Sequence, residues 1–325
     1  MVRSDTRRTR RFALLAVGAM LAGLAALPAA AAPDGDFRPP GLDKQDTLRW
    51  VAPKGFKIGT AVAGGGHHVD QPVPDPFNMD PEYRALIGKE FNSVTPENHL
   101  KWEMVHPEQG QYDFAPADEV IAYALEHKQD VRGHTLVWHS QNPDWLEEGD
   151  FTADELRDIL RDHIHTVVGR YKGKIQQWDV ANEIFLGSGA WRNTIWYQAL
   201  GPDYVADAFR WAHEADPDAL LFLNDFGVEG INAKSTAYYN LIQQLLEDGV
   251  PVHGFGIQGH LSIQFGFPGN VQANLERFDA LGIKTAFTEV DVRMNLPASG
   301  IRSRRCGTSS PIMATPAPAA SGRVG

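Results

Sequence analysis

Residues 175–183 read Ile-Gln-Gln-Trp-Asp-Val-Ala-Asn-Glu, and this stretch decides the fold of the chain. It is a short β-like run that ends in polar residues. Helical patterns lie on both sides of it, at residues 152–171 and 203–215. A second β-like run follows at residues 219–225. Strands that alternate with helices predict βαβ units and a parallel sheet.

The same alternation extends in both directions. We expect seven strands, at residues 56–63, 93–97, 131–138, 175–183, 219–225, 254–260 and 284–291. We expect helices at residues 116–127, 152–171, 203–215, 233–246 and 270–281. Thr152 and Glu155 have capping-box spacing, and Gly249 and Gly282 mark helix ends. Seven strands at this spacing favour a (β/α)8 (TIM) barrel whose last helix-strand-helix portion is missing. An open doubly wound sheet is the less favoured alternative, because residues 63–68 lack the spacing of a dinucleotide-binding turn.

The bulk numbers fit one large domain. The chain has 325 residues, and a TIM barrel takes about 250. The formal net charge is −11, although residues 1–32 carry five Arg and residues 301–325 carry four. The body between these ends is therefore more acidic still. Such a surface repels phosphate backbones, which argues against a nucleic-acid partner, whereas a neutral polymer is not repelled.

The first 32 residues predict a signal peptide. Five Arg precede an apolar run over residues 12–27, and alanines at 29–32 offer cleavage sites. We therefore expect a secreted, extracellular protein with no membrane contact after the signal is removed. The pair at residues 10–11 leaves the Sec and twin-arginine routes both open. Cys306 is the only cysteine, so the chain has no internal disulfide.

Candidate catalytic groups lie where barrel strands end, since barrel enzymes place their active sites there. The fourth strand ends at Glu183, and the seventh carries Glu289 near its end. Two carboxyl groups at separate strand ends are what glycoside hydrolysis requires: one donates a proton, and the other attacks or activates water. A separation of about 5–5.5 Å would indicate retention through a covalent intermediate. The competing interpretation is that each Glu caps a helix or pairs with a surface Lys.

Five motifs, in order and at barrel spacing, make a family resemblance specific. Asn-x-x-Thr-x-Glu-Asn-x-x-Lys-Trp covers residues 92–102, and Arg-Gly-His-Thr-Leu-Val-Trp-His-Ser-Gln covers 132–141. Trp-Asp-Val-Ala-Asn-Glu (178–183), Gly-x-Gln-x-His (256–260) and Thr-Glu-Val-Asp (288–291) follow. Together they resemble the motifs of glycoside hydrolase family 10 endo-1,4-β-xylanases over about residues 45–297.

The resemblance implies a retaining endo-hydrolase of internal β-1,4-xylosidic bonds in xylan or xylo-oligosaccharides. Glu183 resembles the general acid/base and Glu289 the nucleophile. His260 would hold Glu289, and Asp291 would orient His260. The implied sugar-binding residues are Glu97, Asn98, Lys101, His134, Trp138, Gln141, Asn182, Asn224, Gln258 and His260. No cofactor is implied. We predict no metal site, because no His pair has HExxH-like spacing. We expect a monomer.

The chain departs from the family at its end. Residues 301–325 contain no acidic and no aromatic residue, which is typical of disorder. The tryptophan that the family's last strand brings over the sugar has no counterpart, since the last Trp is Trp211. We therefore divide the chain into a signal peptide (1–32), an incomplete catalytic barrel (33–300) and a disordered tail (301–325). Either a frameshift or a truncation after about residue 297 would account for this end, and the two alternatives stay open. An unfinished barrel predicts impaired folding and little activity.

Two alternatives stay open. A β-1,4-glucanase or mannanase of the same barrel type would use the same two carboxyl groups. An inactive sugar-binding remnant would keep the motifs without the chemistry, because the eighth strand is absent.

Overall fold

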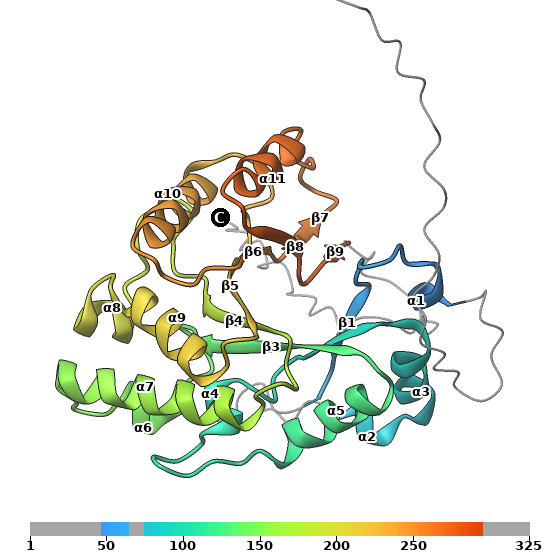
Figure 1. Ribbon diagram of the computed structural model, residues 1–325, viewed down its shortest axis with the longest axis horizontal. Helices are drawn as coiled ribbons and strands as arrows, with labels where there is room; N and C mark the ends of the chain where they lie inside the picture. Colours follow the sequence, from blue (N-terminus) through green and yellow to red (C-terminus); the bar gives the residue numbers. More distant parts are fainter. Residues whose placement is uncertain (1–46, 65–74, 295–325) are drawn as a thin grey trace, which may run out of the picture.

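The computed structural model describes residues 47–64 and 75–294 (Figure 1). The predicted signal peptide at 1–32 and the predicted tail at 301–325 lie outside the described residues, as do His67 and His68. None of the helices in the described part is both long and apolar enough to cross a membrane.

Seven parallel strands form one sheet in the part of the chain that the structure describes. Each strand pairs with the next in the order β1-β2-β3-β4-β5-β6-β8. The strands are β1 Gly59–Val62, β2 Ser93–Pro96, β3 Asp130–Val137, β4 Gln177–Asn182, β5 Leu220–Asp225, β6 Gly254–Ile257 and β8 Lys284–Phe287. Sequential parallel neighbours with helical connections are the arrangement of a TIM barrel, so the predicted fold class is confirmed.

Helices lie in an arc around the outside of the strands (Figure 1). They are α1 Leu48–Val51, α2 Pro76–Met79, α3 Pro81–Glu90, α4 Trp102–Val105, α5 Ala115–Glu126, α6 Asp144–Glu147, α7 Ala153–Arg170, α8 Ile195–Leu200, α9 Tyr204–Ala215, α10 Ala233–Glu247 and α11 Val271–Asp279. The five predicted helices correspond to α5, α7, α9, α10 and α11. The capping box is present, because Thr152 accepts from the backbone of Glu155 while Glu155 accepts from the backbone of Thr152. Gly249 and Gly282 follow helix ends with φ of 68° and 80°.

The structure ends two predicted strands early. Residues 254–260 and 284–291 were each predicted as one strand, but β6 ends at Ile257 and β8 at Phe287. Gly259 has a φ of 76°, which an extended strand does not accommodate. A second parallel pair then forms from β7 His260–Ser262 and β9 Asp291–Arg293, with His260 opposite Asp291. This pair brings two predicted site residues side by side.

The core fills the space between the sheet and the helices. Trp178 points into it from β4 and is fully buried, as expected for a barrel aromatic. On the outer side, the buried rings of Trp102 and His163 stack with centroids 3.5 Å apart. Nδ1 of His163 lies 3.3 Å from Nδ1 of His106, which is also buried. Burial lowers the pKa of His106 to about 4. Burial and then the charge of His106 lower the pKa of His163 well below its ordinary range.

The edge of the sheet at β8 carries exposed apolar side chains. Phe287, Val290 and Val292 are 43%, 59% and 48% exposed. These fractions are large for residues next to a barrel strand. Apolar side chains exposed beside the last strand of a seven-stranded sheet are an aggregation hazard.

Candidate active site

The predicted site residues gather at the carboxyl ends of the parallel strands. Glu183 follows β4, Asn224 lies in β5, Gln258 follows β6, and Glu289 follows β8. Because neighbouring parallel strands end at the same side of a sheet, the register of β4, β5, β6 and β8 sets how these side chains meet.

Glu289 is held by two side chains that donate hydrogen bonds to it. Nδ2 of Asn224 lies 2.8 Å from Oε1, and Nε2 of His260 lies 3.2 Å from Oε2. The hydroxyl of Thr288 donates to Oδ1 of Asn224 at 2.7 Å, which turns the amide nitrogen of Asn224 toward Glu289. The other ring nitrogen of His260 lies 3.0 Å from Oδ2 of Asp291. The ring satisfies both carboxylates only when both of its nitrogens carry a proton.

These contacts favour the ionised form of Glu289. Burial alone would raise its pKa, but the hydrogen bond from His260, the charges of His134 and Arg132 and the hydrogen bond from Asn224 outweigh burial and lower the pKa to about 2. The pKa of His260 is raised, first by its hydrogen bond to Glu289 and then by the charges of Glu289 and Asp291, against burial. An ionised carboxylate beside a protonated imidazole is suited to nucleophilic attack.

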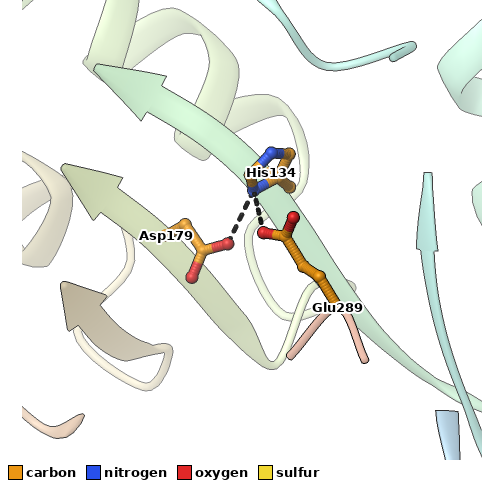
Figure 2. Close-up of side chains that lie close together, drawn as sticks. All are labelled: His134, Asp179 and Glu289. Atoms are coloured by element: carbon orange, nitrogen blue, oxygen red, sulfur yellow. Dashed lines mark hydrogen bonds and ion pairs between the residues drawn. The ribbon is translucent and has the colours of Figure 1, made fainter. Parts of the chain in front are cut away.

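A second buried network supports this pair from β3 and β4. Asp179 is fully buried and accepts from the guanidinium of Arg132 and, at 2.7 Å, from Nδ1 of His134. Figure 2 shows the His134 ring facing both Asp179 and Glu289. Its Nδ1 is 4.0 Å from Oε1 of Glu289. Positive charge from Arg132 and His134 is thereby brought close to Glu289.

His134, Asp179 and Glu289 are also close enough together to hold a metal ion. Their geometry is explained without one. Arg132 already neutralises Asp179, and the nearest nitrogen of His134 is bound to the same carboxylate. A cation placed there would compete with the fixed charge of Arg132. The arrangement therefore favours an ion-pair network over a metal centre.

Glu183 lies opposite, largely buried at 9% exposure. Nε2 of Gln258 donates to its Oε1 at 3.1 Å, and Nδ1 of His139 is 3.7 Å from Oε2. Burial and then the charge of Arg192 lower the pKa of His139, which favours its neutral form. The neighbouring amide of Asn182 lies 2.9 Å from Nδ2 of Asn224 and 3.1 Å from the indole nitrogen of Trp138. Asn182 and Asn224 therefore bridge the space between the two glutamates.

A polar floor extends from the site toward β2 and β3. Nζ of Lys101 donates to Asn98 at 3.0 Å and to Gln141 at 2.7 Å, and it lies 4.9 Å from the centre of the Trp138 ring. Burial lowers the pKa of Lys101, opposed by the negative charges of Glu289, Glu97, Glu103 and Glu183. Glu97 stands at the end of β2, half-buried. Asn98, Lys101 and Gln141, which the resemblance implies to bind sugar, thus lie in one cluster beside Trp138.

Several residues of the site were not predicted from the sequence. Arg132, Asp179 and His139 lie beside the two glutamates. Arg192 and Tyr238 bind the backbone that follows Glu183, and Asp225 and Lys234 hold Tyr238. Asp179 and Asp225 lay within predicted strands, where a fully buried carboxylate is costly unless it is paired. An acidic residue inside a buried strand was therefore the available signal that a partner lies nearby.

Comparisons with known proteins agree with this geometry. Residues 48–314 match Glycosyl hydrolase family 10. The chain is 45% identical over 210 residues to Endo-1,4-beta-xylanase B of Thermotoga neapolitana, covering 65% of this chain and 61% of the relative. It is 45% identical over 212 residues to Beta-1,4-xylanase of Dictyoglomus thermophilum, covering 65% and 59%. The crystal structure of xylanase 10B from Thermotoga petrophila RKU-1 in complex with xylobiose has a TM-score of 0.73 and 42% identity, covering 81% of this chain and 77% of that one.

The chain spans about three fifths of the length of the two curated relatives. The family match nevertheless includes every strand of the seven-stranded sheet and both glutamates. The fold, the paired carboxyl groups at the ends of β4 and β8 and the extent of the match lead to one conclusion. The chain belongs to glycosyl hydrolase family 10.

Proposed function

We propose that this protein is a retaining endo-1,4-β-xylanase that cleaves internal bonds of xylan and xylo-oligosaccharides. The single observation that carries the proposal is the contrast between the two glutamates. Glu289 is surrounded by donors and positive charge that keep it ionised, whereas Glu183 lies opposite, largely buried, with one amide donor and a histidine near it. Two carboxyl groups in different surroundings can take different roles.

The proposed reaction has two displacements. In the first, a carboxylate oxygen of Glu289 attacks the anomeric carbon while Glu183 donates its proton to the glycosidic oxygen, and the leaving sugar chain departs. In the second, Glu183 removes a proton from water, the water oxygen attacks the anomeric carbon, and the Glu289 carboxylate is released. Two inversions give net retention of the β configuration.

The other side chains have proposed roles in binding. Asn182 would hydrogen-bond the 2-hydroxyl of the sugar under attack, a contact that strengthens in the transition state. Lys101 and Asn98 offer fixed polar groups on the non-reducing side, next to the apolar face of Trp138. His134, Gln141 and Gln258 would line the groove near the bond that is cut. Sugars are neutral and combine hydroxyls with apolar faces, so a floor of this composition suits them.

Export of the protein is a further part of the proposal. It is supported by the basic and then apolar sequence of residues 1–32, which precedes alanine-rich cleavage sites. An extracellular location suits an enzyme whose substrate is a plant polymer. N-terminal sequencing of the protein from the culture medium tests this point, and an intact N-terminus that stays with the cells would contradict it.

The test of activity is hydrolysis of a xylo-oligosaccharide by the full chain, with the product anomers followed by NMR. We expect the β-anomer to appear first and Glu289→Ala to abolish cleavage. The α-anomer appearing first would contradict the retaining mechanism. Parallel assays with cello- and manno-oligosaccharides test the glucanase and mannanase alternatives. A folded sample that binds xylo-oligosaccharide without cutting any of the three would establish the sugar-binding remnant.

A further inference from the structure

The peptide bond that follows Glu183 is held at both ends by side chains from elsewhere in the chain. Nε of Arg192 donates to the carbonyl oxygen of Glu183 at 2.8 Å. The N–H of Ile184, on the same peptide bond, donates to the hydroxyl oxygen of Tyr238 at 3.1 Å. The plane of this peptide is therefore fixed by two contacts that point in opposite directions.

Glu183 needs such support because of its backbone conformation. Its φ is 56°, in the left-handed region that side chains other than glycine rarely adopt. A residue stays there only when its surroundings over-determine it. The N–H of Glu183 is also bound, to the carbonyl oxygen of Asn224 at 2.9 Å. Relaxation of the backbone to an ordinary φ would swing the carboxyl group away from the position opposite Glu289.

Tyr238 is itself anchored so that it can act as a fixed point. It is fully buried, and its hydroxyl donates to Oδ2 of Asp225 at 2.6 Å. The other oxygen of Asp225 accepts from Nζ of Lys234 at 2.5 Å, and Nζ also donates to the carbonyl of Phe226 at 2.9 Å. Asp225 and Lys234 are both buried, so this ion pair is shielded from water. The hydroxyl oxygen of Tyr238 therefore has little freedom to move.

Arg192 reaches Glu183 from the loop after β4. Its backbone N–H donates to the carbonyl of Ile184 at 2.8 Å, and Phe185 forms a bridge with Trp191 in the same loop. The loop after β4 thus folds back on itself, and this brings the guanidinium of Arg192 against the backbone of Glu183. Arg192 is half-buried, so a substitution of this residue does not open the core.

We propose that Tyr238 and Arg192 are positioning residues that clamp the Glu183–Ile184 peptide and so aim the carboxyl group of Glu183 at the leaving oxygen. The proposal rests on the proposed function, in which Glu183 is the acid/base. Neither side chain donates to the Glu183 carboxyl itself. Their effect is on where the proton is delivered.

Substrates with different leaving groups distinguish a loss of Glu183 positioning from a general loss of stability. A dinitrophenolate leaves without a proton, whereas a phenolate needs one. A misplaced acid therefore slows the first displacement only for phenyl β-xylobioside. A loosened fold slows both substrates alike. The kcat/KM of the wild-type chain, Tyr238→Phe and Arg192→Met is measured on both, with thermal unfolding to show that each variant is folded.

We expect both variants to lose about tenfold or more in kcat/KM on phenyl xylobioside, since a general acid contributes on the order of 10²–10⁴, and to lose less than about threefold on dinitrophenyl xylobioside. Azide, which attacks without a base, should restore kcat of the variants on dinitrophenyl xylobioside. Arg192→Met tests the proposal even if Tyr238→Phe disturbs the buried ion pair of Asp225 and Lys234.

Tyr171→Phe is the matched control. Tyr171 is also buried and also donates to an aspartate that pairs with a basic residue, Asp118 with Arg170, but this group joins the first turns of α5 to the end of α7. We expect this substitution to leave the ratio of the two rates unchanged. Equal losses on both substrates in Tyr238→Phe and Arg192→Met would overturn the proposal. A wild-type chain that is folded but cleaves neither aryl xylobioside nor xylo-oligosaccharide would instead refute the proposed function, and the positioning role with it.

Discussion

The side chain of Asn224 donates a hydrogen bond to Glu289, with 2.8 Å between Nδ2 and Oε1. The backbone carbonyl of Asn224 accepts the N–H of Glu183 at 2.9 Å. One residue of β5 thus fixes the carboxyl group of one glutamate and the main chain of the other. The distance between the two reacting groups depends on this link.

Removing the Asn224 amide should therefore cost activity with little cost in folding. We expect Asn224→Ala to lower kcat/KM on xylo-oligosaccharide about 10²-fold, the order found when one fixed donor is lost from an active site. Steady-state kinetics and thermal unfolding are the measurements. Asn78→Ala, on the surface helix α2, is the control and should keep full activity. A kcat/KM within about threefold of wild type for Asn224→Ala would contradict the link.

The pH profile should report the charge around Glu289. Its pKa is lowered from 4.5 to about 2, so the folded enzyme keeps the ionised form above about pH 2. Its contribution to the free energy of unfolding is fully present above about pH 4.5 and is lost progressively as the pH falls from there through about 2. The acidic limb of kcat/KM from this group should therefore lie near pH 2. His260→Asn removes the largest favourable contact and should move the limb up toward the ordinary range of a glutamate. Coincident profiles of wild type and variant would show that His260 does not set this pKa.

Gly256 is required by the position of Asn224. A Cβ atom at residue 256 would overlap Oδ1 of Asn224 and would lie 3.0 Å from Cγ2 of Thr288. Gly256→Ala should push the amide of Asn224 away from Glu289 and reduce kcat/KM by roughly tenfold or more. Gly269→Ala, where an added Cβ meets open space, is the matched control. Equal kinetics for the two variants would mean that Asn224 has room to shift without loss.

The buried histidine pair should make stability depend on pH. The pKa of His106 is lowered to about 4 and that of His163 is lowered well below its ordinary range, so the folded state favours both neutral rings. As the pH falls from about 6.5 toward 4, the unfolded chain binds protons that the folded chain does not, so the free energy of unfolding should drop over this range.

His163→Phe keeps the stacking on Trp102 and removes one of the two titrating rings. We expect its melting temperature to fall less than that of the wild type between about pH 7 and pH 5. His165→Phe, two residues along on the exposed side of α7, should leave the pH dependence of wild type unchanged. If the melting temperatures of wild type and His163→Phe fell equally with pH, the buried histidine pair would not be the cause of the pH dependence.

The sequence predicted the strands and the pair Glu183 and Glu289 because both follow from local patterns. Alternation of apolar runs with helical periods defines the strands, and the strand-end rule then selects the glutamates. The predicted contact of His260 with Glu289 and Asp291 also appears in the structure. The β7–β9 pair that produces this contact was missed, since three-residue strands carry no periodic signal.

The supporting residues could not be found in the same way. The contact between Arg132 and Asp179 depends on the register of β3 against β4, which shifts between His134 and Val137. The left-handed backbone conformation of Glu183 could not be predicted from its residue type, because glutamate is not favoured in that conformation. Contacts that depend on inter-strand register and on single backbone angles lie beyond what spacing along one chain can report.

Asn224 belongs to a buried strand and not to a loop. The sheet therefore fixes the spacing of the two glutamates through the two hydrogen bonds of Asn224. The loops that follow β4 and β5 lie at the same end of the sheet as the two glutamates, and Phe226 in the second loop is exposed. These loops can be exchanged or lengthened to suit longer or branched sugar chains while the spacing of the two glutamates stays the same. An engineer who seeks a new specificity should therefore begin with the loops and leave β5 untouched.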